Sequence, residues 1–255
     1  MELKQEKQTY EMLHQLTYYE CDDTGHPTMS KMLSMMTMVS DAHCIALGMD
    51  TATIQQTGGA WVITEYDGEV AADQPTFGDQ VILGTRALAY NRFFALREFW
   101  MTDPNHEKRY LHLRAIFVFM NLEKRRLMSI PKQLIEPFGS PAQKRLPRLA
   151  SPAAITSADP ASKKYQVRYF DIDVNHHANN ARYLDWLIDP LGGEFLRAHR
   201  PIRLVIKYQH EVRENTTVTS QYQLVKNDNG LTSRHTLLVG DQVCATAEIG
   251  WGTAR

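Results

Sequence analysis

The sequence predicts an α+β protein of two tandem units, each an antiparallel sheet wrapped around a long central helix. Three observations support this prediction. Apolar alternation typical of strands fills much of both halves, one helical stretch precedes a run of four strands in each half, and a segment rich in Pro, Ala and Ser separates the halves. A helix followed by consecutive strands favours an antiparallel sheet with the helix on one face. We expect the two sheets to pair into one surface that buries both helices.

The first half contains the longer predicted helix, over residues 28–48, and methionines mark its apolar face. Met32 and Met36 belong to a stripe at three- and four-residue spacings. Such a stripe predicts a helix face in the core, and its flexible thioethers would also suit the wall of a pocket for an alkyl chain. Strands are predicted before and after this helix, near 9–19, 61–71, 79–90, 92–102 and 110–121.

The second half repeats this order after an extended linker. The linker spans 137–163 and has no clear period, which predicts domains over 1–136 and 164–255. The helix is predicted to begin at about residue 179. Strands are predicted near 164–170, 202–212, 216–227, 231–240 and 243–251.

The two halves resemble one unit written twice. DDTGHPTMSKML (22–33) matches IDVNHHANNARY (172–183) at an offset of 150, which places Asp23 opposite Asp173. YDGEV (66–70) matches YQHEV (208–212) at an offset of 142, which places Glu69 opposite Glu211. In this alignment the first half has an acid opposite Asp173 but neither an Asn opposite Asn175 nor a His opposite His177. We therefore expect one active site per chain, in the second half, with Glu69 a solvated or structural acid.

Composition and charge exclude several classes of protein. The net charge is −1 and hydrophobic content is 43%, which is ordinary for a globular protein and does not suggest a nucleic-acid partner. No apolar run approaches the roughly 20 residues that span a bilayer, so no membrane span is predicted. The polar N-terminus and three unpaired cysteines predict a cytoplasmic protein with reduced thiols. Residues 121–150 are markedly basic, which predicts either a solvated surface or a site for an acidic partner.

The stretch DIDVNHHANN (171–180) concentrates polar side chains just before a helix. A metal site is disfavoured because no second His or Cys cluster is nearby, so no metal or cofactor is predicted. Asn179 or Asn180 could cap the helix, but a cap does not explain the other polar residues. In an extended chain Asp173, Asn175 and His177 share one face, beside free amides at the helix start. Such an arrangement suits attack on an acyl carbonyl. No GxSxG motif supplies a serine, so water or a carboxylate must attack.

DIDVNHHANNARYLDW also resembles the signature of the fatty acyl-ACP thioesterases of plants and bacteria. The resemblance continues collinearly through WVITEYDGEV, NRFFALREFW, VFMNLEKRRLMSIP and KYQHEVREN, from about residue 18 to 251. It implies two tandem hotdog domains and an enzyme that hydrolyses the thioester of acyl-acyl carrier protein, releasing free fatty acid and ending chain elongation. It also implies that Asp173, Asn175, His177 and Glu211 are the catalytic set.

One departure from the family bears on mechanism. Plant members have a Cys after the catalytic Glu, whereas this chain has Val212. The difference favours attack by water activated by Glu211, with His177 assisting and Asn175 and the helix-start amides holding the carbonyl oxygen. Exchange of the roles of Glu211 and Asp173 stays open, because hotdog thioesterases also use an acid as nucleophile.

The resemblance implies partners and binding residues as well. An acidic acyl carrier protein would meet basic residues on the surface, and the acyl chain and thioester would contact the first half and the helix start. An acyl-CoA thioesterase, another hotdog enzyme such as a dehydratase, and a non-catalytic acyl-thioester binding module are the alternatives, and a homodimer is an alternative to a monomer. The residues expected to meet the carrier protein are Lys124, Arg125, Arg126, Arg200 and Arg203. Those expected to bind substrate are Trp61, Met32, Met36, Asn179 and Asn180.

Overall fold

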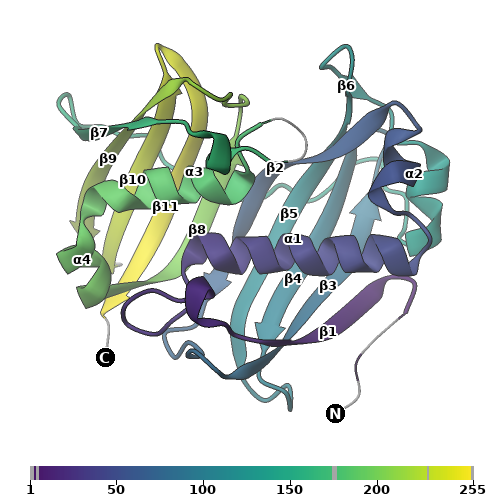
Figure 1. Ribbon diagram of the computed structural model, residues 1–255, viewed down its shortest axis with the longest axis horizontal. Coiled ribbons are helices and arrows are strands. Elements are labelled where there is room, and N and C mark those ends of the chain that lie inside the picture. Colours follow the sequence, from purple (N-terminus) through teal and green to yellow (C-terminus); the bar gives the residue numbers. More distant parts are fainter. Residues whose placement is uncertain (1–2, 4–5, 174–176, 229, 254–255) are drawn as a thin grey trace.

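In the computed structural model, ten strands form one continuous antiparallel sheet and an eleventh, β6, pairs with β5 at its side (Figure 1). The structure describes residue 3 and residues 6–173, 177–228 and 230–253. The strand order is β1-β3-β4-β5-β2-β8-β11-β10-β9-β7, so each half contributes five neighbouring strands in an equivalent order. The halves join where β2 pairs with β8, from Glu65 opposite Lys207 to Glu69 opposite Arg203. The predicted fold class is confirmed.

The first half begins with a short strand and a 3-10 turn before its long helix. The strand ends earlier than predicted, because the chain turns at η1 after residue 17. The elements are β1 (Thr9–Gln15), η1 (Tyr18–Glu20), α1 (Met29–Ala46), α2 (Thr51–Gln55), β2 (Gly59–Val70), β3 (Gln80–Tyr90), β4 (Phe94–Thr102), β5 (Arg109–Asn121), β6 (Leu127–Met128), η2 (Lys132–Leu134) and η3 (Glu136–Phe138).

The second half repeats the strand, 3-10 turn and helix, but its helix is interrupted. Pro190 stands two residues after Ile188, the last residue of α3, and a proline ring cannot continue a regular helix, so α3 gives way to a second short helix, α4. The elements are β7 (Ala161–Gln166), η4 (Tyr169–Asp171), α3 (Asn180–Ile188), η5 (Asp189–Leu191), α4 (Gly193–Ala198), β8 (His199–Tyr208), β9 (Thr217–Asn227), β10 (Gly230–Val239) and β11 (Gln242–Thr253).

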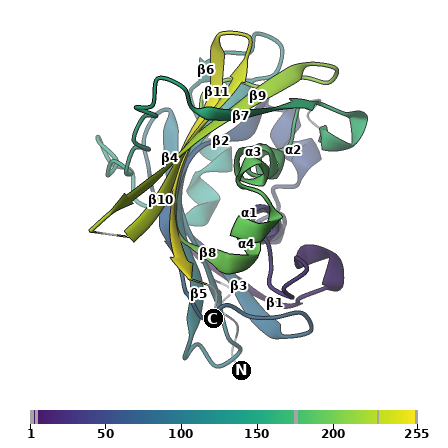
Figure 2. The ribbon, with the colours of Figure 1, turned by 90° about the vertical axis from the view of Figure 1, so that its left-hand side faces the viewer.

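Both helices lie on one side of the curved sheet (Figure 2). They run in opposite directions with their N-terminal ends near each other (Figure 1). Met32 and Met36 on α1 are at most 1% exposed, and the core that contains them continues to Leu184 and Leu187 of α3. Burial of these apolar side chains is the main force that holds each helix against the sheet.

The segment between the two halves packs on the opposite face of the sheet. Leu149 is buried there against Leu96 and Ile116, whose neighbours along β4 and β5 face the helices. The amide of Ala150 donates to Asp67 at 2.8 Å, which fixes the segment across the junction of the halves. The domain boundaries at 136 and 164 stay a prediction.

Among the described residues, no helix is long and apolar enough to cross a membrane.

Candidate functional site

The residues of interest lie in a tight turn that connects η4 to α3, called here the C-terminal turn (171–179). Its ends are closed by two backbone hydrogen bonds, from Asn179 N to Asp171 O and from Asp173 N to His177 O, each 2.9 Å long. Ile172 and Ala178 form an antiparallel bridge between them. Residues 174–176, including the predicted catalytic Asn175, lie outside the described residues. The turn therefore presents Asp173 and His177 from its two adjacent arms.

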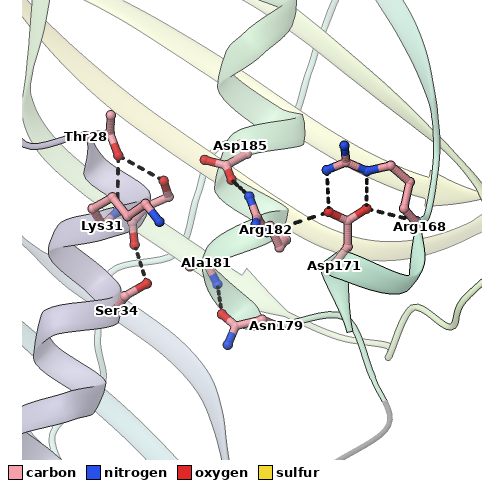
Figure 3. A network of polar contacts seen from close by, with 10 residues as sticks. Thr28, Lys31, Ser34, Arg168, Asp171, Asn179, Ala181, Arg182 and Asp185 are labelled. Atoms are coloured by element: carbon pink, nitrogen blue, oxygen red, sulfur yellow. Dashed lines mark hydrogen bonds and ion pairs between the residues drawn. The ribbon is translucent and has the colours of Figure 1, made fainter. Parts of the chain in front are cut away.

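Asp171 supports this turn rather than the chemistry (Figure 3). Its side chain is 1% exposed and pairs with Arg168 at 2.9 Å and with Arg182 at 3.7 Å. The backbone amide of Arg168 also donates to its carboxylate, at 2.9 Å. Burial acts to raise the pKa of Asp171, but the hydrogen bonds and charge of Arg168 hold that pKa below its usual value. A buried carboxylate with these partners fixes the start of the turn.

His177 and Glu211 meet at the surface of the protein. The Nε2 atom of His177 lies 3.1 Å from Oε2 of Glu211. Glu211 follows β8 in a loop, and Ala178 N donates to Val212 O at 2.9 Å, which ties that loop to the C-terminal turn. The His177 side chain is 16% exposed and that of Glu211 is 39% exposed. The structure thus brings together two of the four predicted catalytic residues, which are 34 residues apart in sequence.

Arg125 completes this cluster from the other half of the chain. Its Nη2 atom contacts both His177 Nε2 and Glu211 Oε2. Arg125 sits in the β5–β6 hairpin with a positive φ of 51°, and its amide donates to Asn121 O at 3.0 Å. A guanidinium only donates hydrogen bonds, so Arg125 can donate to Glu211 Oε2, and to His177 Nε2 when that nitrogen carries no proton. Sequence reasoning assigned Arg125 to a basic surface, and no local motif indicated this contact.

The surroundings of His177 keep its pKa below the usual value for histidine. Burial is the largest cause, and the positive charges of Arg125 and Arg213 act in the same direction. The carboxylates of Glu211 and Asp173 oppose this effect without cancelling it. His177 is therefore neutral at pH 7 and able to accept a proton.

Val212 occupies the position that follows Glu211, where the plant thioesterases named above have a cysteine. It is 1% exposed, and its backbone N–H donates to the hydroxyl of Tyr183 at 2.8 Å. The Tyr183 hydroxyl donates in turn to His210 O at 3.2 Å. These bonds hold the backbone on both sides of Glu211, so Tyr183 supports this loop from α3. Among the described residues, no group of three or more His, Cys, Asp or Glu is placed to hold a metal ion.

A groove of about 430 Å³, called here the first groove, lies between α1 and the start of α3. Asn179 and Asn180 line it, and Asn179 is also the N-cap of α3, since its Oδ1 accepts from Ala181 N at 2.9 Å. Arg182 N donates to Asn179 O at 2.8 Å. The backbone N–H groups of Ala181 and Arg182 therefore already have acceptors. Fewer free N–H groups remain at the start of α3 to bind a substrate carbonyl oxygen than the sequence suggested.

The other predicted substrate-binding residues lie away from this groove. Met32 and Met36 are buried in the core beneath α1. Trp61 is half-buried on the same face of the sheet, with its ring edge-to-face to Phe119 at 5.1 Å. Phe119 pairs with Met128 in the β5–β6 hairpin, so Trp61 lies at the base of the hairpin that carries Arg125.

The basic residues predicted to meet a carrier protein do not form one group. Lys124 and Arg126 are exposed on the β5–β6 hairpin. Arg125 has the contacts described above, and Arg203 pairs with Asp67 on β2. Arg200 donates from Nη1 and Nη2 to the hydroxyl of Thr24, at 3.3 and 3.4 Å.

The first half contains a matching turn, called here the N-terminal turn (20–28), and its register corrects the sequence alignment. Thr28 N donates to Glu20 O and Asp22 N donates to His26 O, as the corresponding atoms do in the C-terminal turn. Both helices and both 3-10 turns also start at an offset of 151. The offset of 150 was therefore wrong. It is Asp22 that corresponds to Asp173, and His26 corresponds to His177.

The counterpart of Glu211 also changes. Gly78 and Asp79 form backbone hydrogen bonds with Leu16. Asn215 and Thr216 form the same two bonds with Val167, so residues in these two loops correspond at an offset of 137. Counting back along both loops places Gln74, which is 6% exposed, at the position of Glu211. Glu69 instead lies within β2, opposite His112, and is exposed as expected. The first half thus keeps an acid and a histidine but has an amide where the second half has Glu211.

Comparison with known proteins identifies relatives over nearly the whole chain. The acyl-ACP thioesterase N-terminal domain matches residues 7–138, and the C-terminal domain of the same family matches residues 156–253. A crystal structure assigned as an oleoyl thioesterase from Lactobacillus plantarum is 35% identical, covers 97% of each chain and has a TM-score of 0.93. The 12:0-ACP thioesterase of Umbellularia californica shares the fold, with 19% identity over 96% of this chain and 94% of that one and a TM-score of 0.82.

Curated relatives are longer than this chain. A chloroplastic acyl-(acyl-carrier-protein) hydrolase of Cuphea viscosissima is 28% identical over 170 residues, which are 63% of this chain and 40% of that protein. A palmitoyl-acyl carrier protein thioesterase of Cuphea hookeriana matches over the same shares at 28% identity. The matches to these plant proteins therefore span less than half of their length.

Proposed function

Because the chain belongs to the acyl-ACP thioesterase family, we propose that it hydrolyses the thioester of acyl-acyl carrier protein and releases free fatty acid. The observation that carries this proposal is that His177 Nε2 and Glu211 Oε2 lie 3.1 Å apart, beside the start of α3, where both can meet one water molecule. A neutral imidazole next to a carboxylate can take a proton from water at neutral pH. The exposure of both groups gives water and a thioester access to them.

In the proposed mechanism, Glu211 accepts a proton from a water molecule while His177 holds that water or receives the proton from it. The resulting hydroxide attacks the thioester carbonyl carbon. The amide of Asn175 and the positive end of α3 stabilise the negative charge on the carbonyl oxygen. The thiolate then leaves, and Asp173 carries charge that favours protonated His177 during the reaction.

Arg125 has a separate role in this mechanism. Its guanidinium contacts Glu211 and His177 at once, so it fixes the two side chains relative to each other before substrate binds. A charged hydrogen bond of this kind restricts rotation of an exposed carboxylate. Arg125 is a positioning residue, and the two halves of the chain thereby contribute to one site.

The acyl chain is proposed to enter beneath α1, where Trp61, Met32 and Met36 lie. The thioester end would then pass Asn179 and Asn180 in the first groove. The acidic carrier protein is proposed to dock on Lys124 and Arg126, because these exposed cations flank Arg125 on the same hairpin. A cytoplasmic location stays a prediction, and the matched Cuphea relatives are chloroplastic by name.

The test is release of thiol from purified protein incubated with acyl-acyl carrier protein and acyl-CoA of several chain lengths. We expect faster release from the carrier-protein thioester. Faster release from acyl-CoA would support the alternative of an acyl-CoA thioesterase. Absence of thiol release from either substrate would contradict hydrolysis and favour a binding module.

A further inference from the structure

A second groove of about 440 Å³ lies between the N-terminal turn, the start of α1, and the flank formed by α3 and α4. It is the counterpart of the first groove. Leu33, Ser34 and Thr37 line the first groove, and Leu184, Asp185 and Ile188, which stand 151 residues later, line the second. The repeat that gives two matching turns therefore also gives two matching grooves.

Among the described residues that line the second groove, Arg200 is a cation for which no ion pair with a carboxylate is seen. Three of the acids that line the groove are paired: Asp23 with Arg197 at 2.7 Å, Asp185 with Arg182 at 3.1 Å, and Asp189 with Lys163 at 2.6 Å.

The fourth lining acid, Asp22, accepts from both the amide and the hydroxyl of Thr24. Arg200 donates only to that same hydroxyl, and no carboxylate of the described residues forms an ion pair with it. A half-buried guanidinium that donates to a hydroxyl and not to a carboxylate favours binding of an anionic ligand.

The rest of the lining is largely apolar. Met29, Leu184 and Trp251 are each at most 5% exposed and form the inner part of the groove. Ile188 and Leu196 continue this surface along α3 and α4 and are partly buried. An apolar lining with one such cation suits a ligand that has an alkyl chain and a single anionic end.

The groove also lacks the group that activates water in the proposed active site. Gln74 lines it at the position of Glu211, and its Nε2 donates to Pro201 O at 3.4 Å. A carboxamide cannot act as a general base near neutral pH. His26, the counterpart of His177, has its Nδ1 3.0 Å from Pro75 O, where the ring is held by a backbone carbonyl.

We propose that the second groove binds a long-chain fatty acid, with the carboxylate on Arg200 and the alkyl chain along Met29, Ile188 and Leu196, and does not hydrolyse what it binds. This proposal rests on the proposed function only in that thioester hydrolysis would supply the fatty acid. Binding itself needs neither His177 nor Glu211.

Trp251 allows a direct test because it lines the groove. Purified protein is titrated with 12-bromododecanoate, whose bromine quenches indole fluorescence at short range, and the same titration of Trp251→Phe isolates the signal of that ring. We expect saturable quenching of Trp251. Arg200→Ala should weaken binding roughly tenfold or more, as expected for loss of a charged hydrogen bond, whereas Arg200→Lys should retain most of it.

Two further titrations separate this site from the proposed active site. His177→Ala should bind the brominated acid at Trp251 as the wild type does, whatever its thioesterase activity. The uncharged 12-bromododecanol should quench Trp251 much more weakly than the acid. The proposal is overturned if no quenching is assignable to Trp251, or if Arg200→Ala and the alcohol both leave the titration unchanged.

Discussion

The N-terminal and C-terminal turns have the same backbone and different chemistry. Each follows a 3-10 turn, closes with the same pair of hydrogen bonds and leads into a helix on the same face of the sheet. In the C-terminal turn His177 meets Glu211, whereas in the N-terminal turn His26 meets a backbone carbonyl and Gln74 replaces the acid. The repeated fold supplies the same backbone geometry twice, and under the proposed mechanism the carboxylate of Glu211 is what allows the second copy to activate water.

In each turn a carboxylate accepts hydrogen bonds from the residue three positions earlier, but the donors differ. Glu20 accepts from the amide and hydroxyl of Thr17 at 2.8 and 2.7 Å. Asp171 accepts instead from the amide and guanidinium of Arg168 and is more deeply buried. The turn with the proposed chemistry is therefore held by a pair with arginine, and the other by a hydroxyl and by His14.

The largest expected effect comes from making the active copy resemble the inactive one. Glu211→Gln should lower kcat for thioester hydrolysis by roughly 10²–10⁴-fold, the usual contribution of a general base. The measurement is the rate of thiol release at saturating acyl-acyl carrier protein. Glu69→Gln is the matched control, because Glu69 is an exposed acid on β2, and it should stay within about twofold of wild type. A near-normal kcat for Glu211→Gln would transfer the role of base to Asp173.

The supports of the two turns should differ in stability. Asp171→Asn should lower the free energy of unfolding by about 1–3 kcal/mol, because the buried carboxylate that accepts from the Arg168 amide and guanidinium is replaced by a neutral amide. Glu20→Gln should cost less, about 1 kcal/mol, since its partners include a neutral hydroxyl and His14. Urea unfolding of both variants and wild type gives the comparison. An equal or larger loss in Glu20→Gln would contradict the difference in support.

The same two carboxyls predict a pH dependence. Hydrogen bonds and charges outweigh burial at both, so the pKa of each is lowered in the folded state. A lowered pKa contributes stability above the unfolded value, near 4, and that contribution is lost as pH falls through the folded pKa. Wild-type stability should therefore decline below about pH 4, and Asp171→Asn should flatten this decline. An unchanged slope in Asp171→Asn would exclude that carboxyl as a source.

Sequence predicted the fold well because apolar periodicity is local. The helix over 28–48 and four strands after it were located within a few residues, and so was the order of the second half. The sequence alignment failed by one residue, since a shift of one leaves acids opposite acids: Asp22 and Asp23 are adjacent. Only the backbone hydrogen bonds of the turns resolve such a slip.

The site was less predictable because its parts are distant in sequence. His177 was predicted from the local polar pattern and Glu211 from a family resemblance, and the structure brings the two side chains together. Arg125 comes from the other half of the chain, 52 residues before His177, and had no signal beyond its charge. Gln74 was missed because it lies in a loop that differs in length from its counterpart, where no periodicity fixes the register.

A smaller effect is expected from the arginine that joins the two halves. Arg125→Ala should lower kcat by roughly tenfold, the cost of one charged hydrogen bond. It should also move the acidic limb of the pH–rate profile to higher pH, because removing that positive charge raises the pKa of His177. The reaction requires neutral His177, so activity is full above this pKa and is lost below it. Arg126→Ala, an exposed neighbour, should leave the limb in place, and an unmoved limb in Arg125→Ala would contradict the positioning role.

The smallest effect should come from the exposed cations on the same hairpin. Replacing Lys124 and Arg126 by Ala together should lower kcat/KM for acyl-acyl carrier protein by only a few-fold at low salt, because rim charges act mainly on association rate. The effect should shrink in 0.5 M salt, where the Debye length is about 4 Å. A small acyl thioester without a carrier protein is the control substrate, and its kcat/KM should respond to neither change. If both substrates lose the same factor, the hairpin acts on the site through Arg125 and not by docking the carrier protein.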